Sequence, residues 1–164
     1  MVDWNALIDE YGPMVVRVSW RILGRGADVE DNVQEVFFEA FRLHQRETIR
    51  QWGGLLRRLA TLGALARLRR RRRESSLGAI TEPARENPPE AGVIAGELEA
   101  RLRAAVAGLP EREGAVFSLR CFEGLELPNI AATLGIRYGA AATALSRARA
   151  KLEEVFTEIA VEDP

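Results

Sequence analysis

The chain has 164 residues, nearly half of them apolar, and its 23 Lys and Arg residues almost balance its 24 Asp and Glu residues. A chain of this length can bury a core as one domain or as two small ones. One cysteine and one histidine exclude an internal disulfide framework and a His/Cys zinc site, so we expect no metal, no cofactor and a reducing, cytoplasmic setting.

Helical periodicity runs through almost the whole sequence, without an alternating strand pattern. The first residues, MVDWNALIDE, are acidic and lack a long apolar run, which argues against a signal peptide or a membrane span. An apolar stripe precedes Gly12, and Pro13 predicts the first turn of a second helix that ends near Leu23.

Asp28 predicts the N-cap of the next helix, whose apolar face includes Val29, Val33 and Val36. The opposite face is polar and acidic, with Phe38 among the charges. A solvated surface accounts for the charges, whereas an exposed aromatic side chain among acids is more typical of an interface. Both interpretations remain open for this face.

The charge then reverses its sign along the chain. Residues 1–41 contain three Arg and eight Asp or Glu, whereas residues 42–73 contain eleven Arg and one acid, Glu47. A predicted helix from Trp52 to Arg73 has an apolar face and ends in a run of arginines. Because helix-dipole complementation explains only the cations of the last turn, a phosphate backbone is the expected partner of the run.

Residues 76–96 are rich in Pro, Gly and Glu and predict a flexible acidic linker between two small helical domains, at 1–75 and 97–160. In the second domain Pro128 begins a short helix, and Gly135 predicts its left-handed C-cap. A longer helix follows, so the pattern indicates a helix-turn-helix, although antiparallel helical hairpins have similar patterns. The expected fold class is all-α.

Two blocks of the sequence resemble extracytoplasmic-function sigma factors, the compact branch of the sigma-70 family that directs bacterial RNA polymerase to promoters. The block LGRGADVEDNVQEVFFEAFR is similar to the second conserved region of this family, and LPEREGAVFSLRCFEGLELPNIAATLGI with LSRARAKL is similar to the fourth. Their order, the linker and the basic helix also match. The resemblance implies an all-α protein that binds core polymerase and promoter DNA.

The resemblance gives the acidic face a partner, the coiled-coil clamp helices of the largest polymerase subunit. Under this interpretation the polymerase covers a face that would otherwise be solvated. An anti-sigma factor is a further candidate partner. The residues matched to the polymerase contact are Asp31, Gln34, Glu35, Phe38 and Glu39.

In this family the following loop and helix bind the minus-ten promoter element as its strands separate. Extruding a base costs on the order of a few kcal/mol, which aromatic side chains and backbone-binding cations recover. Trp52 matches an aromatic position of the loop, and it could equally be a core residue. The candidates for this contact are Arg46, Arg50, Trp52, Arg58, Arg67, Arg69 and Arg70.

The sequence departs from the family pattern in both DNA-binding helices. The usual Asn and Asp of the basic helix are Leu62 and Ala66 here, and the usual Lys and Arg of the last helix are Ala142 and Ala144. Since the start of a recognition helix reads bases in the major groove, we expect weakened recognition of the minus-thirty-five element. The remaining candidates on this helix-turn-helix are Arg137, Thr143, Ser146, Arg147 and Arg149.

Three functional hypotheses remain. The first is a working sigma factor with loose upstream recognition, and the second is a sigma-derived interaction protein that has lost promoter recognition. The third, an enzyme, lacks support, because the sequence contains no visible nucleophile and base pair, metal set or phosphate loop. Cys121 lies on an apolar-patterned helix and is expected to be a packed thiol.

Overall fold

The structure, a computed structural model, describes residues 1–24, 26–78 and 90–162. The described residues form seven α-helices and no strand, so the all-α prediction is confirmed. None of these helices combines the length and the apolar character that a membrane span requires. The helices are α1 (Trp4–Leu23), α2 (Gly26–His44), α3 (Trp52–Ser76), α4 (Glu90–Ala107), α5 (Glu111–Cys121), α6 (Leu127–Leu134) and α7 (Tyr138–Glu162).

Helix α1 is continuous, so the predicted break at Pro13 is wrong. Asp3 caps the helix, its carboxylate accepting hydrogen bonds from the backbone N–H groups of Asn5 and Ala6 at 3.0 and 3.1 Å. Gly24 ends the helix in the left-handed conformation, with φ of 63°. Proline removes one backbone hydrogen bond, but the buried stripe continues past it and holds the two halves of the helix in line.

Helix α2 begins at Gly26, so Asp28 is not its N-cap. The carboxylate of Asp28 instead forms an ion pair with Arg71 of α3, and the same guanidinium donates a hydrogen bond to the carbonyl of Leu23 at 2.9 Å. A cation from another helix therefore satisfies both the acid at the start of α2 and the carbonyl at the end of α1.

The predicted linker at 76–96 is too long, because helix α4 already begins at Glu90. Gly92 and Gly96 concealed this start, since glycine disfavours helix interiors. Helix α3 also extends through Ser76, whose hydroxyl donates to the carbonyl of Arg72 at 2.9 Å. The central part of the predicted linker, at 79–89, lies outside the described residues.

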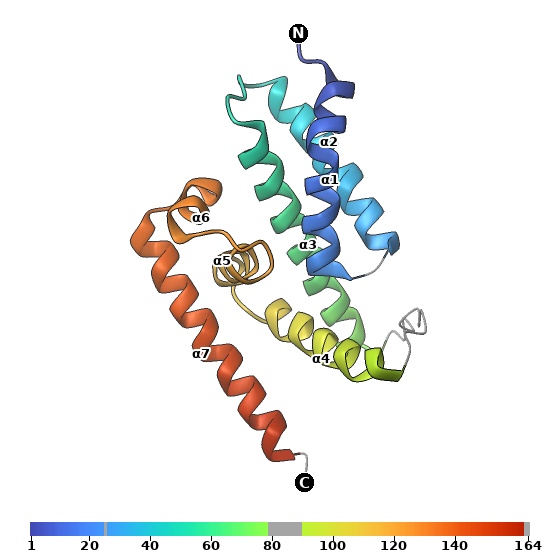
Figure 1. Cartoon of the computed structure of the whole chain (residues 1–164), viewed down its shortest axis with the longest axis vertical. Helices are drawn as coiled ribbons and strands as arrows, with labels where there is room; N and C mark the ends of the chain where they lie inside the picture. The colour runs from blue at the N-terminus through green and yellow to red at the C-terminus, as the bar shows by residue number, and fades with distance from the viewer. Residues whose placement is uncertain (25, 79–89, 163–164) are drawn as a thin grey trace.

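Helix α3 is the centre of the molecule (Figure 1). It packs against α1 and α2 on one side and against α4, α5 and α6 on the other. Ala60, Ala64 and Leu65 are completely buried, and Leu65 lies next to Gly114 of α5. One continuous hydrophobic cluster therefore includes residues from both halves of the chain, α1–α3 and α4–α7.

Helices α6 and α7 form the predicted helix-turn-helix. Pro128 lies in the first turn of α6, and Gly135 ends that helix with φ of 65°, as predicted. The N–H of Ile136 then donates to the carbonyl of Ala131 at 3.0 Å, which tightens the turn. Helix α7 follows at Tyr138 and runs along the edge of the molecule to the C-terminal end (Figure 1).

Candidate nucleic-acid and protein interfaces

The predicted acidic face lies on the side of α2 that points away from the core. Val29, Val36 and Ala40 are buried on the opposite side of the same helix. The polar face is partly organised by arginines: Glu35 pairs with Arg67 at 3.7 Å, and Glu39 pairs with Arg42 at 3.5 Å. All five predicted residues share this face, with Glu39 half-buried and the others exposed, namely Asp31, Gln34, Glu35 and Phe38.

Phe38 is the most exposed large side chain of the acidic face, with 65% of its surface accessible. Burying an apolar side chain of this size stabilises a protein or a complex by about 2 kcal/mol relative to leaving it in water. Phe38 lies one residue after Phe37, which packs against the core, so its outward position follows from helical geometry. The face therefore has an apolar contact point surrounded by carboxylates.

Trp52 packs within an aromatic cluster at the start of α3. Its ring centroid lies 5.6 Å from that of Trp4 and 5.7 Å from that of His44, and Trp4 in turn meets Phe41 at 5.3 Å. The contacts of Trp4 are edge-to-face and that of His44 with Trp52 is tilted, and together they join α1, α2 and α3. Trp52 is half-buried, so the cluster favours the core role that the sequence left open.

The loop between α2 and α3 presents two of the predicted cations. Arg46 and Arg50 are both exposed on this loop, beside the half-buried Ile49. The backbone of Arg46 stays close to α2, because its N–H donates to the carbonyl of Leu43 at 2.9 Å. Both are accessible to a nucleic-acid backbone, as are the exposed Arg58 and Arg70 of α3.

Arg58 and Leu62 lie on the side of α3 that faces the helix-turn-helix. They line a shared cavity with Leu134 and Ile136, the residues on either side of the Gly135 cap. Leu62 is half-buried and belongs to the hydrophobic cluster. Its packing gives a physical reason for an apolar residue where the family usually has Asn.

The arginine run at the end of α3 is largely occupied by contacts within the chain. Arg67 pairs with Glu35, and Arg70 pairs with Glu74 at 3.9 Å. Arg69 reaches the other half of the molecule, where it donates to the carbonyl of Leu109 at 3.2 Å and lies 3.9 Å from a carboxylate oxygen of Glu111. These arginines therefore stabilise the fold as well as carrying positive charge.

Every predicted helix-turn-helix residue is exposed in the structure. Leu145, Ala148 and Leu152 are buried on the opposite side of α7 from Thr143, Ser146 and Arg147. Arg149 lies between the two sides, where it lines a cavity with Leu102 and Phe117. The trailing cation Lys151 instead donates to Glu113 of α5 at 2.7 Å. The exposed set is Arg137, Thr143, Ser146, Arg147 and Arg149.

The alanines at the start of α7 differ in their environment. Ala141 and Ala144 are buried, with 0% and 4% of their surface accessible, whereas Ala142 is half-buried. Gly139 faces open space, because a Cβ atom at this position would meet nothing within 4 Å. A long side chain therefore fits at position 142 but not at position 144 without repacking.

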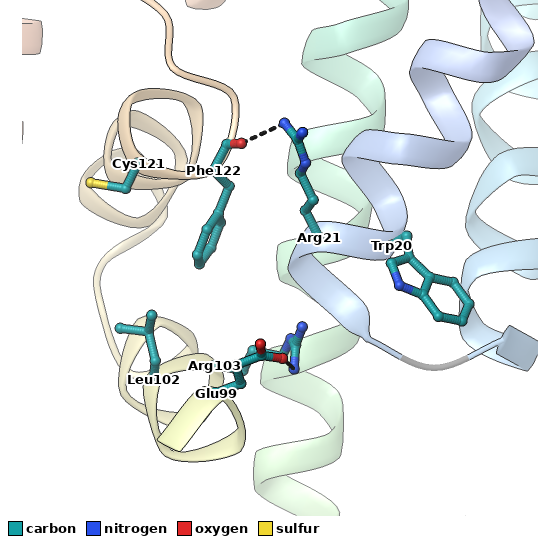
Figure 2. Close-up of a pocket in the computed structure, with 7 residues that line it drawn as sticks. All are labelled: Trp20, Arg21, Glu99, Leu102, Arg103, Cys121 and Phe122. Carbon is teal, nitrogen blue, oxygen red and sulfur yellow. Dashed lines mark hydrogen bonds and ion pairs between the residues drawn. The ribbon is translucent and has the colours of Figure 1, made fainter. Parts of the chain in front are cut away.

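A buried carboxylate joins the two halves of the molecule. Glu123 follows α5, and only 5% of its side chain is accessible. It pairs with Arg21 at 3.1 Å and with Arg17 at 3.7 Å, both from α1. Arg21 also donates to the carbonyl of Phe122 at 2.6 Å (Figure 2). We call this set the Glu123 contact; nothing in the sequence pattern pointed to it.

Cys121 lies at the surface, so the prediction of a packed thiol is wrong. Partial burial raises the pKa of the Cys121 thiol, against the opposing effect of the nearby Arg149 and Arg120. Its sulfur points away from Arg21 in Figure 2. The thiol is therefore accessible but mostly protonated at neutral pH.

Sequence reasoning also missed Tyr138, the first residue of α7. It is 57% exposed, next to the predicted Arg137. The available signal was an aromatic residue directly before the run of Gly and Ala residues at 139–142.

Comparison with known families matches both halves of the chain. A family model for sigma-70 region 2 matches residues 7–74, and one for sigma-70 region 4 matches residues 99–152. The matches lie within the two predicted domains, although the division itself stays a prediction because the halves share one hydrophobic cluster.

Curated relatives align over almost the whole chain. The ECF RNA polymerase sigma factor SigE of Mycolicibacterium smegmatis is 32% identical over 163 residues, which cover 96% of this chain and 63% of the relative. The ECF RNA polymerase sigma factor SigW of Bacillus subtilis is 24% identical over 165 residues, which cover 93% of this chain and 88% of the relative. The chain thus spans less than two thirds of the length of SigE.

Solved structures share the fold. CnrH, in complex with the cytosolic domain of CnrY, has a TM-score of 0.59 at 21% identity and covers 94% of this chain, with 87% of its own chain aligned. The sigma factor RpoE, in complex with the anti-sigma factor NepR from Bartonella quintana, has a TM-score of 0.58 at 20% identity, with 94% and 97% covered. Since regions 2 and 4 match in their order along the chain and the ECF relatives align with both, this chain belongs to the extracytoplasmic-function group of the sigma-70 family.

Proposed function

We propose that the chain is a sigma factor that binds bacterial core RNA polymerase and promoter DNA and directs transcription initiation. The observation that carries the proposal is the exposed acidic face of α2, with Phe38 at its centre, on the same chain as an outward-facing helix-turn-helix. The first surface suits a protein partner, and the second suits a DNA duplex. The acidic face lies within the region 2 match, and the helix-turn-helix lies within the region 4 match.

The polymerase contact is proposed for the acidic face of α2. Burial of Phe38 in a partner would stabilise the complex by about 2 kcal/mol, and the surrounding carboxylates would select a basic partner surface. The clamp helices of the largest subunit are the expected partner. The contributing residues are Asp31, Gln34, Glu35, Phe38 and Glu39.

The minus-ten contact is proposed mainly for the loop before α3. Arg46 and Arg50 are exposed there and would bind phosphates of the separated strand. Trp52 supports the loop through its aromatic contacts. The α3 arginines at 58, 67, 69 and 70 contribute positive potential, although most of them already contact the chain itself.

The upstream contact is proposed for the helix-turn-helix, with weak recognition of the minus-thirty-five element. Arg137, Arg147 and Arg149 would bind phosphates, whereas Thr143 and Ser146 offer hydroxyl groups to sugars or bases. The helix lacks the Lys and Arg that the family usually has at positions 142 and 144; here position 142 is half-buried and position 144 is buried. Phosphate contacts would therefore position the helix, with few hydrogen bonds to bases.

The proposed function also implies where the chain works and which protein regulates it. Sigma factors are regulatory DNA-binding proteins, and we propose that this chain has no catalytic activity of its own. Because bacterial RNA polymerase works in the cytoplasm, the chain would work there too. Both solved structures are complexes with a second protein, named as an anti-sigma factor in the RpoE complex. An anti-sigma factor is the regulator that we propose for this chain.

A binding experiment tests the proposal. The purified chain is incubated with bacterial core polymerase and a library of promoter fragments, and the fragments retained on the complex are sequenced. We expect a stable complex and enrichment of related fragments, and we expect Phe38→Ala to weaken core binding about thirtyfold, the equivalent of burying one aromatic ring. Thr157→Ala, an exposed change at the far end of α7, is the matched control.

Two outcomes would contradict the proposal in different ways. Stable core binding without enriched fragments would favour a sigma-derived interaction protein that has lost promoter recognition. Absence of core binding would exclude both functions. The apolar packing of Leu62 and the burial of Ala144 are the observations that keep the interaction protein as the second candidate.

A further inference from the structure

Tyr138 occupies the first turn of the recognition helix and is the largest side chain there. It lies directly after Arg137, whose carbonyl accepts the first hydrogen bond of α7, from the N–H of Ala141 at 3.1 Å. With 57% of its surface accessible, the ring is not part of the hydrophobic core. In a helix-turn-helix this end of the second helix is the part that meets base edges.

The surroundings of the ring leave room for a duplex. A Cβ atom at Gly139 would meet nothing within 4 Å, so the neighbouring surface is open. The first turn of α7 lies at the outer edge of the molecule, away from α1 and α2 (Figure 1). Arg137, the neighbour of Tyr138 in the sequence, is exposed and can bind a flanking phosphate.

The chemistry of the surface is apolar. Ala142 is one helical turn after Tyr138 and is half-buried, so the two side chains follow each other on one flank of the helix. Neither can form the bidentate hydrogen bonds by which Arg or Lys selects guanine. Apolar side chains do distinguish one base in the major groove, because thymine alone carries a methyl group there.

We propose that Tyr138 and Ala142 read the upstream duplex through apolar contact with thymine methyl groups. The inference rests on the proposed function and names the feature of the promoter that this helix selects. Exposed Tyr138 supplies the contact area, and the open surface at Gly139 leaves room for the duplex. Neither Tyr138 nor Ala142 carries a cation that could select guanine, so a thymine methyl group is the feature that these two side chains can recognise. The preferred upstream element is therefore rich in thymine at the positions under the first turn of α7.

Replacing thymine with deoxyuridine tests this inference, because the change removes only the methyl group. The full chain and core polymerase are bound to a promoter fragment from the library selection, with the upstream thymines replaced. We expect about fourfold weaker binding for each contacted methyl, the worth of burying one such group. Tyr138→Ala should bind the thymine fragment more weakly than wild type does, and it should show little difference in affinity between the thymine and deoxyuridine fragments. Tyr138→Phe should keep that difference in affinity.

Controls separate this inference from the proposed function. Val155→Ala removes an exposed apolar side chain from the same helix, far from the turn, and should keep the deoxyuridine effect. If the wild-type complex binds promoter fragments but is indifferent to deoxyuridine, the inference is wrong and the proposed function stands. Equal deoxyuridine effects in wild type and Tyr138→Ala would also overturn it. If the wild-type chain binds no promoter fragment, both fail.

Discussion

Asn32 shows how one polar residue can fix the arrangement of three helices. It is completely buried on α2, and its amide donates to the hydroxyl of Ser19 at 2.8 Å and to the carbonyl of Ala60 at 3.1 Å. Ser19 in turn donates to the carbonyl of Val15 at 2.7 Å. A buried network of this kind is stabilising while its members stay paired, and costly once one is removed.

We therefore expect Asn32→Ala to lower the free energy of unfolding by about 2 kcal/mol, since two hydrogen bonds are lost in a buried site. Urea denaturation followed by circular dichroism measures the change. Asn129→Ala, at an exposed position of α6, is the control and should change the free energy by less than about 0.5 kcal/mol. Equal effects of the two changes would show that the network does not hold α1, α2 and α3 together.

The alanines of α7 give a second test at the residue scale. A lysine at the half-buried position 142 can extend to solvent, so Ala142→Lys should strengthen upstream-duplex binding and steepen its salt dependence by about one unit of slope. Ala144 is buried, so Ala144→Arg should destabilise the fold by more than about 2 kcal/mol without a gain in binding. Salt titrations of duplex binding, with thermal unfolding of each variant, distinguish the two. A binding gain from Ala144→Arg would contradict this account of the helix.

At the scale of helices, Pro13 and Pro128 occupy opposite situations. Pro128 lies in the first turn of α6, where its missing N–H costs nothing, whereas Pro13 lies within α1 on an exposed site. Pro13→Ala should restore one backbone hydrogen bond and raise the free energy of unfolding by about 1–3 kcal/mol. Pro128→Ala should give no gain. If thermal unfolding shows no increase for Pro13→Ala, the backbone hydrogen bond that Pro13 removes does not limit the stability of α1.

The contrast between a proline at a helix start and a proline inside a helix also explains which elements can be predicted from the sequence. At Pro128 and Gly135 the conformation depends on the residue itself, because proline favours the first turn of a helix and glycine favours a left-handed C-cap. The sequence therefore predicts the turn of the helix-turn-helix correctly. The sequence misplaces the break at Pro13, because the buried stripe of α1 crosses this residue, and it misplaces the start of α4, because the glycines at 92 and 96 obscure the helical pattern. Asn32 resembled an ordinary polar residue of an amphipathic helix, since its partners on α1 and α3 are distant in the sequence.

In the whole molecule, the surfaces proposed for DNA and the contacts between the two halves overlap. Arg58 and Leu62 face the helix-turn-helix, and Arg69 binds the carbonyl of Leu109. Separation of the two halves would therefore widen the access of a nucleic-acid strand to this side of α3 beyond the exposed Arg58. Such contacts join residues far apart in the sequence, so periodicity and motif spacing could not predict them.

The Glu123 contact should control that separation. Glu123→Gln removes the charge that holds Arg17 and Arg21, which we expect to weaken the closed arrangement by about 1 kcal/mol, because both arginines are about half exposed and partly screened. In small-angle scattering the radius of gyration should rise with increasing salt as the halves separate, and this rise should occur at a lower salt concentration for the variant than for wild type. Glu126→Gln is the matched control, since Glu126 pairs with Arg120 within its own half. Identical salt profiles for Glu123→Gln and wild type would show that other contacts hold the halves.

The most direct test of the central claim is the sequencing of transcript 5′ ends made by core RNA polymerase with and without this chain. The account predicts a defined set of start sites that requires the chain, shares an upstream sequence and is lost with Phe38→Ala while Thr157→Ala leaves it intact. Start sites that are the same with core polymerase alone would contradict the assignment of this chain as a promoter-directing sigma factor.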